Sequence, residues 1–205
     1  MPKLFRDLAR SGGHDVNVAM LVQGGWTLNN HLHGNSIETI QRGPWDYVVL
    51  QEQSAIPSKT FLRERQMFPA IRKLNMEIEK VGAKTILFMT WGHRDGTAIL
   101  GIHDYTDMQS KIIEGYDEIG RELAITLSPV GKAWQELLVM NPQIELWQTA
   151  GSHPYLSGSY LSACVFYSVV FQDNPEGLPF IGGLPEDEGL RLQQVATRFV
   201  FEDDK

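Results

Sequence analysis

The sequence of residues 147–171 is WQTAGSHPYLSGSYLSACVFYSVVF, a polar turn that leads directly into an apolar segment. Residues 160–171 are apolar on nearly every side, which is typical of a helix buried in a protein core. His153 therefore lies where a loop meets a rigid element. Histidine has an unperturbed pKa near neutrality, so His153 is a candidate general base. The alternative is a loop histidine that caps the helix or bonds a backbone carbonyl.

The bulk composition predicts one globular domain over residues 1–205. The chain is 42% hydrophobic and 21% charged, which is ordinary for a globular protein. Its formal charge of -7 argues against nucleic acid or an anionic membrane as a partner. The single cysteine, Cys164, lies in the apolar segment, so we interpret it as a small core residue.

The N-terminal sequence contains neither a membrane-spanning run nor a secretory signal pattern. We therefore expect a cytoplasmic protein for the chain as written. A natural N-terminus lying upstream would make a secreted or periplasmic protein the alternative.

Strand and helix patterns alternate along the chain. Nearly continuous apolar runs at residues 46–51 and 85–91 are typical of strands covered on both faces, and a short run at 123–127 predicts another. Residues 16–22 alternate in a way that predicts an edge strand. Helical spacing or end signals predict helices at residues 2–10, 28–32, 68–81, 108–123, 132–140 and from 185 onward. The alternation predicts a three-layer α/β/α domain with a mostly parallel sheet.

Loops at the carboxyl ends of parallel strands are where such sheets bind ligands. Three loops qualify by position, and they are residues 23–26 (QGGW), 51–54 (QEQS) and 92–96 (GHRDG). We expect His153 to meet these loops at the same rim of the sheet.

The runs Gly151-Ser152-His153-Pro154 and 158–167 (GSYLSACVFY) resemble the C-terminal catalytic block of the SGNH (GDSL-like) hydrolases, in particular a bacterial branch of them. The resemblance implies a flavodoxin-like sheet of the SGNH type. It also implies that His153 is the catalytic histidine. The family's Asp-x-x-His pattern places its aspartate at Ala150, which has no carboxylate.

The same resemblance implies an oxyanion hole. Gly25 matches the backbone N–H donor, and Gln51 or Gln53 matches the side-chain amide donor. The alternatives are a plain tight turn at Gly24-Gly25 and, for Gln51, a strand-end amide that satisfies loop backbone.

Further residues near these loops are candidates for substrate binding. The run His93-Arg94-Asp95 resembles a Trp-x-His-Arg-Asp run of the same bacterial branch, which implies substrate positioning. The alternative is an Arg94 and Asp95 ion pair that orders the loop. Three more residues are candidates for contact with substrate because of their positions, and these are Trp26, Ser54 and Ser152.

The SGNH family places its nucleophilic serine after the first strand of the sheet, and this chain begins at what matches the following helix. The resemblance therefore implies a sheet that lacks the family's first strand. Ser54 and Ser152 are the serines expected near the rim, but neither lies on a strand-to-helix turn. Because unpaired backbone is costly, we expect four or five strands with a rearranged edge or one paired with another chain, as in a homo-oligomer.

Metal and nucleotide sites are weaker interpretations. His31-x-His33, His93 with Asp95, and His103-Asp104 lack the spacing of a metal-ligand set, and no Gly-rich phosphate loop follows a strand. We expect no cofactor and no metal.

Two hypotheses of function remain. The first is a hydrolase of carboxylic esters, carbohydrate acyl esters or lactones, with water in place of the serine. The second is a catalytically silent relative that keeps the cleft for binding, which Ala150 and the absent serine turn favour.

Overall fold

The computed structural model describes residues 1–201, which form two compact units. Unit 1 consists of Met1–Met20 and the chain from Pro129 onward, and unit 2 consists of Leu21–Ser128. The single domain expected over residues 1–205 stays a prediction.

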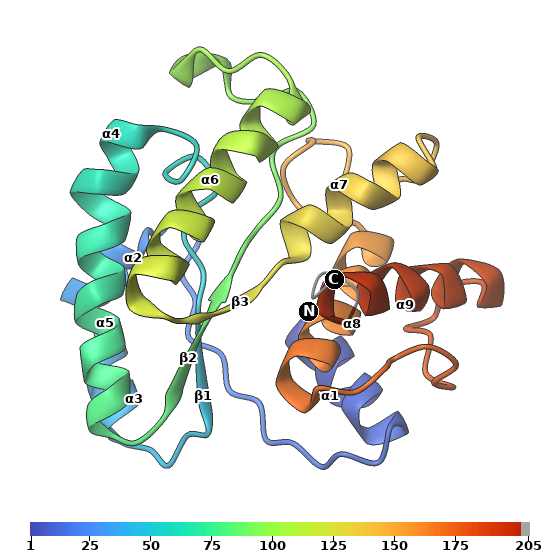
Figure 1. The fold of residues 1–205 in the computed structure, drawn as a ribbon, viewed down its shortest axis with the longest axis horizontal. Coiled ribbons are helices and arrows are strands. Elements are labelled where there is room, and N and C mark those ends of the chain that lie inside the picture. The colour runs from blue at the N-terminus through green and yellow to red at the C-terminus, as the bar shows by residue number, and fades with distance from the viewer. Residues whose placement is uncertain (202–205) are drawn as a thin grey trace. The chain divides into compact units, whose positions relative to one another are not determined.

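Unit 2 is built on a parallel sheet with the strand order β1-β2-β3 (Figure 1). Its strands are β1 (Tyr47–Leu50), β2 (Lys84–Phe88) and β3 (Thr126–Ser128). The register pairs Leu50 with Leu87, and Leu87 with Leu127. The α/β class with a parallel sheet is therefore confirmed, and each strand lies in or overlaps an apolar run that predicted it.

One face of this sheet packs against the helices of unit 2. These are α2 (Leu28–His33), α3 (Ser36–Gln41), α4 (Thr60–Leu62), the π-helical η1 (Arg63–Met67), α5 (Phe68–Lys80), the 3-10 helix η2 (Ala98–Leu100) and α6 (Tyr105–Leu123). Leu50 and Leu87 of the sheet share a core cluster with Ile71 of α5 and Ile112 of α6. The helical spacing of apolar residues thus predicted α5 and α6 correctly, whereas α3 was not predicted.

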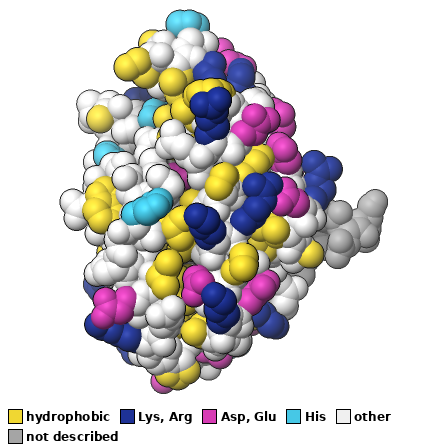
Figure 2. Space-filling view, turned by 90° about the vertical axis from the view of Figure 1, so that its left-hand side faces the viewer, with side chains coloured by type: hydrophobic (Ala, Val, Ile, Leu, Met, Phe, Trp, Pro, Cys, Tyr) yellow, Lys and Arg dark blue, Asp and Glu magenta, His cyan; other side chains and the backbone are white. Residues whose placement is uncertain are grey.

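The surface over α5 carries charges of both signs. Figure 2 shows Lys and Arg side chains interspersed with Asp and Glu on this face. Arg72 of α5 donates two hydrogen bonds of 2.6 Å to Glu122 of α6, and Lys80 pairs with Glu77 at 2.6 Å. Interspersed charges of this kind are typical of a solvated helix face.

Unit 1 is helical and is organised around the apolar helix predicted from the sequence. Its helices are α1 (Pro2–Ser11), α7 (Val130–Met140), α8 (Leu156–Phe171) and α9 (Glu186–Phe201). Helix α8 contacts the other three, and the ring of Phe5 stacks on that of Phe171 at 5.9 Å. Cys164 of α8 is fully buried, and burial raises the pKa of its thiol, as expected for a core residue.

Within the described residues, no helix is long and apolar enough to cross a membrane.

Two expectations about the sheet were wrong. Residues 16–22 form no strand, although their side chains alternate in type. Met20 and Val22 are 63% and 65% exposed, so this alternation lacks the covering layer that makes a half-buried strand. Among residues 1–201 the sheet has three strands rather than the four or five expected.

Candidate functional site

The predicted residues of unit 2 lie in the segments that follow β1 and β2. Because the strands are parallel and Leu50 pairs with Leu87, both segments leave the sheet at its carboxyl edge. The turn that carries Gly25 immediately precedes α2, whose first residue bonds to Glu52 in the segment after β1. The structure therefore brings the Gly25 turn and the segment after β1 into the same region.

Glu52 is the residue that joins these two segments, and it was not among the predicted site residues. Its side chain is fully buried, and Oε1 accepts hydrogen bonds from Leu28 N at 3.1 Å and Gln53 N at 2.7 Å. Its Oε2 is buried and has no hydrogen-bond partner among the described residues. A carboxyl oxygen in this position can hold a proton or accept a hydrogen bond from a bound molecule.

Burial changes the ionisation of this group. Desolvation raises the pKa of Glu52 from 4.5 to about 7, although the two backbone N–H donors act in the opposite direction. Tyr116 of α6 lies beside it, since the Glu52 N–H donates to the Tyr116 hydroxyl at 3.2 Å. Burial first, and then the charge of Glu52, raise the pKa of Tyr116. A buried acid with a pKa near neutrality is a candidate for proton transfer.

The alternation of side chains along β1 was the signal for Glu52. Leu50 is 5% exposed and faces the core cluster, and residue 52 follows on the same face. The sequence instead favoured Gln51 and Gln53 as site residues, because side-chain amides can donate to an oxyanion.

Gly25 lies in a tight turn closed by a hydrogen bond of 3.1 Å from Trp26 N to Gln23 O. Its φ of 74° requires glycine, and a Cβ there would meet nothing within 4 Å. Its backbone is thus held in a defined conformation beside open space. Trp26 is 39% exposed and packs edge-on against His31 at 5.1 Å.

The amides after β1 differ in their surroundings. Gln51 is exposed, whereas Gln53 is half-buried and accepts a 2.9 Å hydrogen bond from Ala55 N through its Oε1. That bond fixes the Gln53 amide over the loop that contains the half-buried Ser54. Gln53 is therefore the better ordered of the two candidate donors.

The segment after β2, which carries His93, Arg94 and Asp95, is anchored on α6. Gln109 is fully buried, and its Oε1 accepts a 2.7 Å hydrogen bond from Gly92 N. The His93 N–H contacts the Met108 sulfur at 3.2 Å. Asp95 makes no ion pair among the described residues, so the ordering Arg94 and Asp95 pair is not observed. Substrate positioning by these residues stays a prediction.

His153 lies in unit 1, in a loop whose ends are joined by a bridge between Trp147 and Pro154. Gln148 N donates to His153 O at 2.8 Å, and Gly151 N donates to Gln148 O at 2.8 Å. The His153 side chain is exposed, and Ser152 is half-buried. Because the other predicted donors belong to unit 2, the meeting of His153 with Gly25 and Gln53 at one rim stays a prediction.

The His153 ring has no orienting carboxylate within the described part of unit 1. It takes part in no hydrogen bond or ion pair there, and Ala150 occupies the position three residues before it. Among residues 1–201, no group of three or more His, Cys, Asp or Glu side chains could hold a metal ion.

Comparison with known proteins gives structural neighbours. No protein-family model matches the sequence, and no curated protein matches it. The solved structure of a DUF4886 family protein from Bacteroides uniformis ATCC 8492 is similar with a TM-score of 0.81 and 16% identity, over 100% of this chain and 91% of that one. A "putative SGNH hydrolase" from Slackia heliotrinireducens is similar with a TM-score of 0.66 and 25% identity, over 81% of this chain and 90% of that one.

Proposed function

We propose that this chain, whose α/β fold is SGNH-like, is a hydrolase that acts on carboxylic esters, carbohydrate acyl esters or lactones. The observation that carries the proposal is the likeness to the protein of Slackia heliotrinireducens that is described as a "putative SGNH hydrolase". The buried acid at the carboxyl edge of the sheet supports it, because its Oε1 joins the two segments that carry the proposed oxyanion donors.

In this proposal His153 acts as general base on a water molecule. The water oxygen attacks the carbonyl carbon of the ester while the imidazole takes its proton. The Gly25 N–H and the amide of Gln53 or Gln51 donate to the resulting oxyanion. Collapse of the tetrahedral intermediate breaks the carbon–oxygen bond, and the leaving alkoxide takes the proton from the imidazolium. The products are the carboxylic acid and the alcohol.

Glu52 is a positioning residue in this scheme. Its hydrogen bonds to Leu28 N and Gln53 N hold the start of α2 and the segment after β1 together. The Gly25 turn and the Gln53 amide come from these two segments, so loss of the carboxyl would misplace both donors. The residues proposed to contact substrate are Trp26, Ser54, His93, Arg94, Asp95 and Ser152.

A catalytically silent binding protein is the second candidate. The specific observation in its favour is that the His153 ring bonds to no carboxylate within the described part of unit 1. Without an orienting carboxylate an imidazole is a weaker catalytic base.

Hydrolysis of p-nitrophenyl acetate by the wild type, His153→Ala and His103→Ala separates the two candidates. His103 is also exposed, so its variant measures the background from a surface imidazole. The hydrolase proposal expects a loss of about 100-fold in His153→Ala alone. Equal rates for all three proteins would favour the silent binding protein. Mass spectrometry after treatment with a fluorophosphonate should show no adduct, whereas an adduct would reveal an activated serine.

A further inference from the structure

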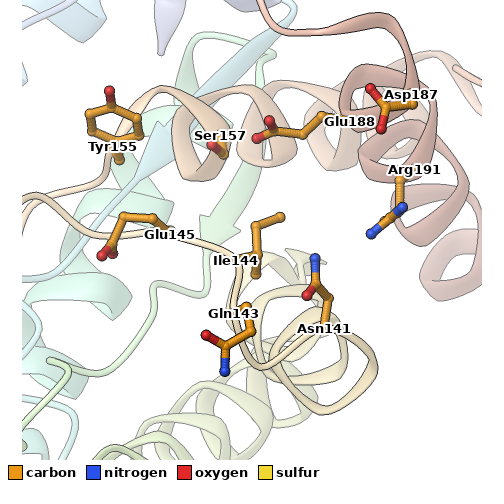
Figure 3. A pocket seen from close by; sticks show the side chains of 9 residues that line it. All are labelled: Asn141, Gln143, Ile144, Glu145, Tyr155, Ser157, Asp187, Glu188 and Arg191. Carbon is orange, nitrogen blue, oxygen red and sulfur yellow. The ribbon is translucent and has the colours of Figure 1, made fainter.

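Unit 1 contains a pocket of about 350 Å³ at the N-terminal end of α8 (Figure 3). It is lined from three directions, by the loop after α7, the start of α8 and the first turns of α9. None of the residues proposed for the hydrolase site lines it. We propose that this pocket binds a neutral, polyhydroxylated compound, namely a single sugar unit.

Ser157 gives the first reason to expect a ligand. It is 3% exposed and lines the pocket, but its hydroxyl has no hydrogen-bond partner among the described residues. In Figure 3 it lies between Tyr155 and Glu188. The Ser157 hydroxyl oxygen is reachable from the pocket, so a polar molecule bound there would be its hydrogen-bond partner.

The charges around the pocket indicate the class of ligand. Asp187 and Glu188 of α9 lie on one side with Arg191, which forms no ion pair among the described residues. Glu145 lines the pocket as well, and its Oε1 accepts a hydrogen bond from Trp147 N at 3.1 Å. The three carboxylates disfavour an anion, and the guanidinium offsets part of their attraction for a cation. Hydroxyl groups are compatible with both, because they donate to carboxylates and accept from guanidinium.

The remaining lining residues fit the same class. Asn141 and Gln143, from the loop after α7, each offer an amide that both donates and accepts. Ile144 and Tyr155 supply apolar surface, and Tyr155 is 53% exposed. Alternating polar groups with some apolar surface match the hydroxyl groups and C–H faces of a sugar ring. The volume is at the small end of ligand pockets, which fits one unit rather than a chain.

This inference rests on unit 1 alone and does not depend on the proposed hydrolase activity. Saturation-transfer NMR with the whole protein can test it at millimolar ligand. Glucose, xylose and N-acetylglucosamine are the neutral probes, and glucosamine and glucuronate are the matched cationic and anionic probes. We expect at least one neutral sugar to bind about tenfold more tightly than either charged one. Tighter binding of a charged probe, or no signal from any neutral sugar, would overturn the proposal.

Single-residue variants test whether the sugar binds in this pocket. Glu188→Gln and Ser157→Ala should each weaken binding of the neutral sugar by about tenfold, because the first replaces a charged acceptor oxygen with an N–H donor and the second removes a hydroxyl. Glu186→Gln is the matched control, since Glu186 lies in the same helical turn and does not line the pocket. Wild-type affinity in Glu188→Gln, or equal weakening in Glu186→Gln, would place the binding elsewhere. Because Glu188 is half-buried, Glu188→Gln should preserve the fold. It therefore tests the proposal even if Ser157→Ala lowers the stability of the protein.

Discussion

The Oε1 atom of Glu52 accepts a hydrogen bond from the backbone N–H of Leu28, across 24 residues of chain, at 3.1 Å. Leu28 is the first residue of α2, so the carboxyl also lies at the positive end of that helix. Even so, burial dominates and raises the pKa of the acid to about 7. The protein therefore holds a group whose charge is costly at neutral pH.

Glu52→Gln should change how stability depends on pH. The pKa of Glu52 is about 7 in the folded protein and 4.5 ordinarily, so the folded state binds more protons between these values. The contribution of Glu52 to the free energy of unfolding is fully present below pH 4.5 and is lost as the pH rises through 7. The loss is about 3 kcal/mol, and the variant should not show it.

Urea unfolding at pH 5 and pH 8 measures this effect. The difference in unfolding free energy between variant and wild type should move in favour of the variant by about 3 kcal/mol between these pH values. Glu77→Gln is the control, because Lys80 lowers the pKa of the half-buried Glu77 below 4.5, so the stability of that variant should follow the wild-type pH dependence between pH 5 and pH 8. Parallel pH profiles for wild type and Glu52→Gln would show that Glu52 does not titrate in this range.

Gln109→Leu should loosen the segment that carries His93, Arg94 and Asp95. Gln109 is buried and holds this segment through Gly92 N at 2.7 Å and Thr90 O at 3.5 Å. Leucine would remove both of these hydrogen bonds, which we expect to cost about 2 kcal/mol.

Hydrogen exchange by mass spectrometry would localise the effect of Gln109→Leu to residues 90–96. Ser110→Ala is the neighbouring control, since the Ser110 hydroxyl donates to Asp107 O within α6. Unchanged exchange in this segment would mean that other contacts hold it.

Much of the fold could be predicted because apolar periodicity is a local signal. The apolar runs predicted β1 and β2, and the spacing from Phe68 to Val81 predicted α5, which the structure ends at Lys80. The pairing of a strand with its neighbour, in contrast, depends on residues that are distant in the sequence. Residues 16–22 have the alternation of a strand, but whether a strand forms depends on a neighbour that pattern alone does not identify.

The candidate site was predictable in part for the same reason. Glu52 lies two residues beyond Leu50, so alternation placed its side chain on the buried face. Its contact with Tyr116, which is 64 residues away, depends on the packing of α6 and left no sign in the sequence. The resemblance predicts that His153 is the catalytic base, and this role stays a prediction.

Gly158→Ala should destabilise unit 1 strongly. A Cβ at this position of α8 would overlap the ring of Trp134 and lie 2.6 Å from Leu146 O. Trp134 is fully buried, and the second neighbour is backbone, so neither can move freely. We expect a loss of about 3 kcal/mol in urea unfolding. Gly24→Ala is the control, because a Cβ at Gly24 would meet nothing within 4 Å. Similar midpoints for both variants would show that α8 can shift to admit the methyl group.

Ala150→Asp tests the proposed role of His153 from the opposite direction. Ala150 is exposed in the turn before His153, so a carboxylate can be introduced there without burying a charge. An aspartate that bonds to the imidazole would orient it and stabilise its protonated form. We expect kcat/KM for p-nitrophenyl acetate to rise at least about tenfold. The gain should vanish in the double variant with His153→Ala, because the aspartate acts only through the imidazole.

Thr149→Asp is the matched control, since it adds the same charge at the preceding exposed position. A gain that persists without His153, or that Thr149→Asp reproduces, would assign the effect to charge alone and remove the proposed base.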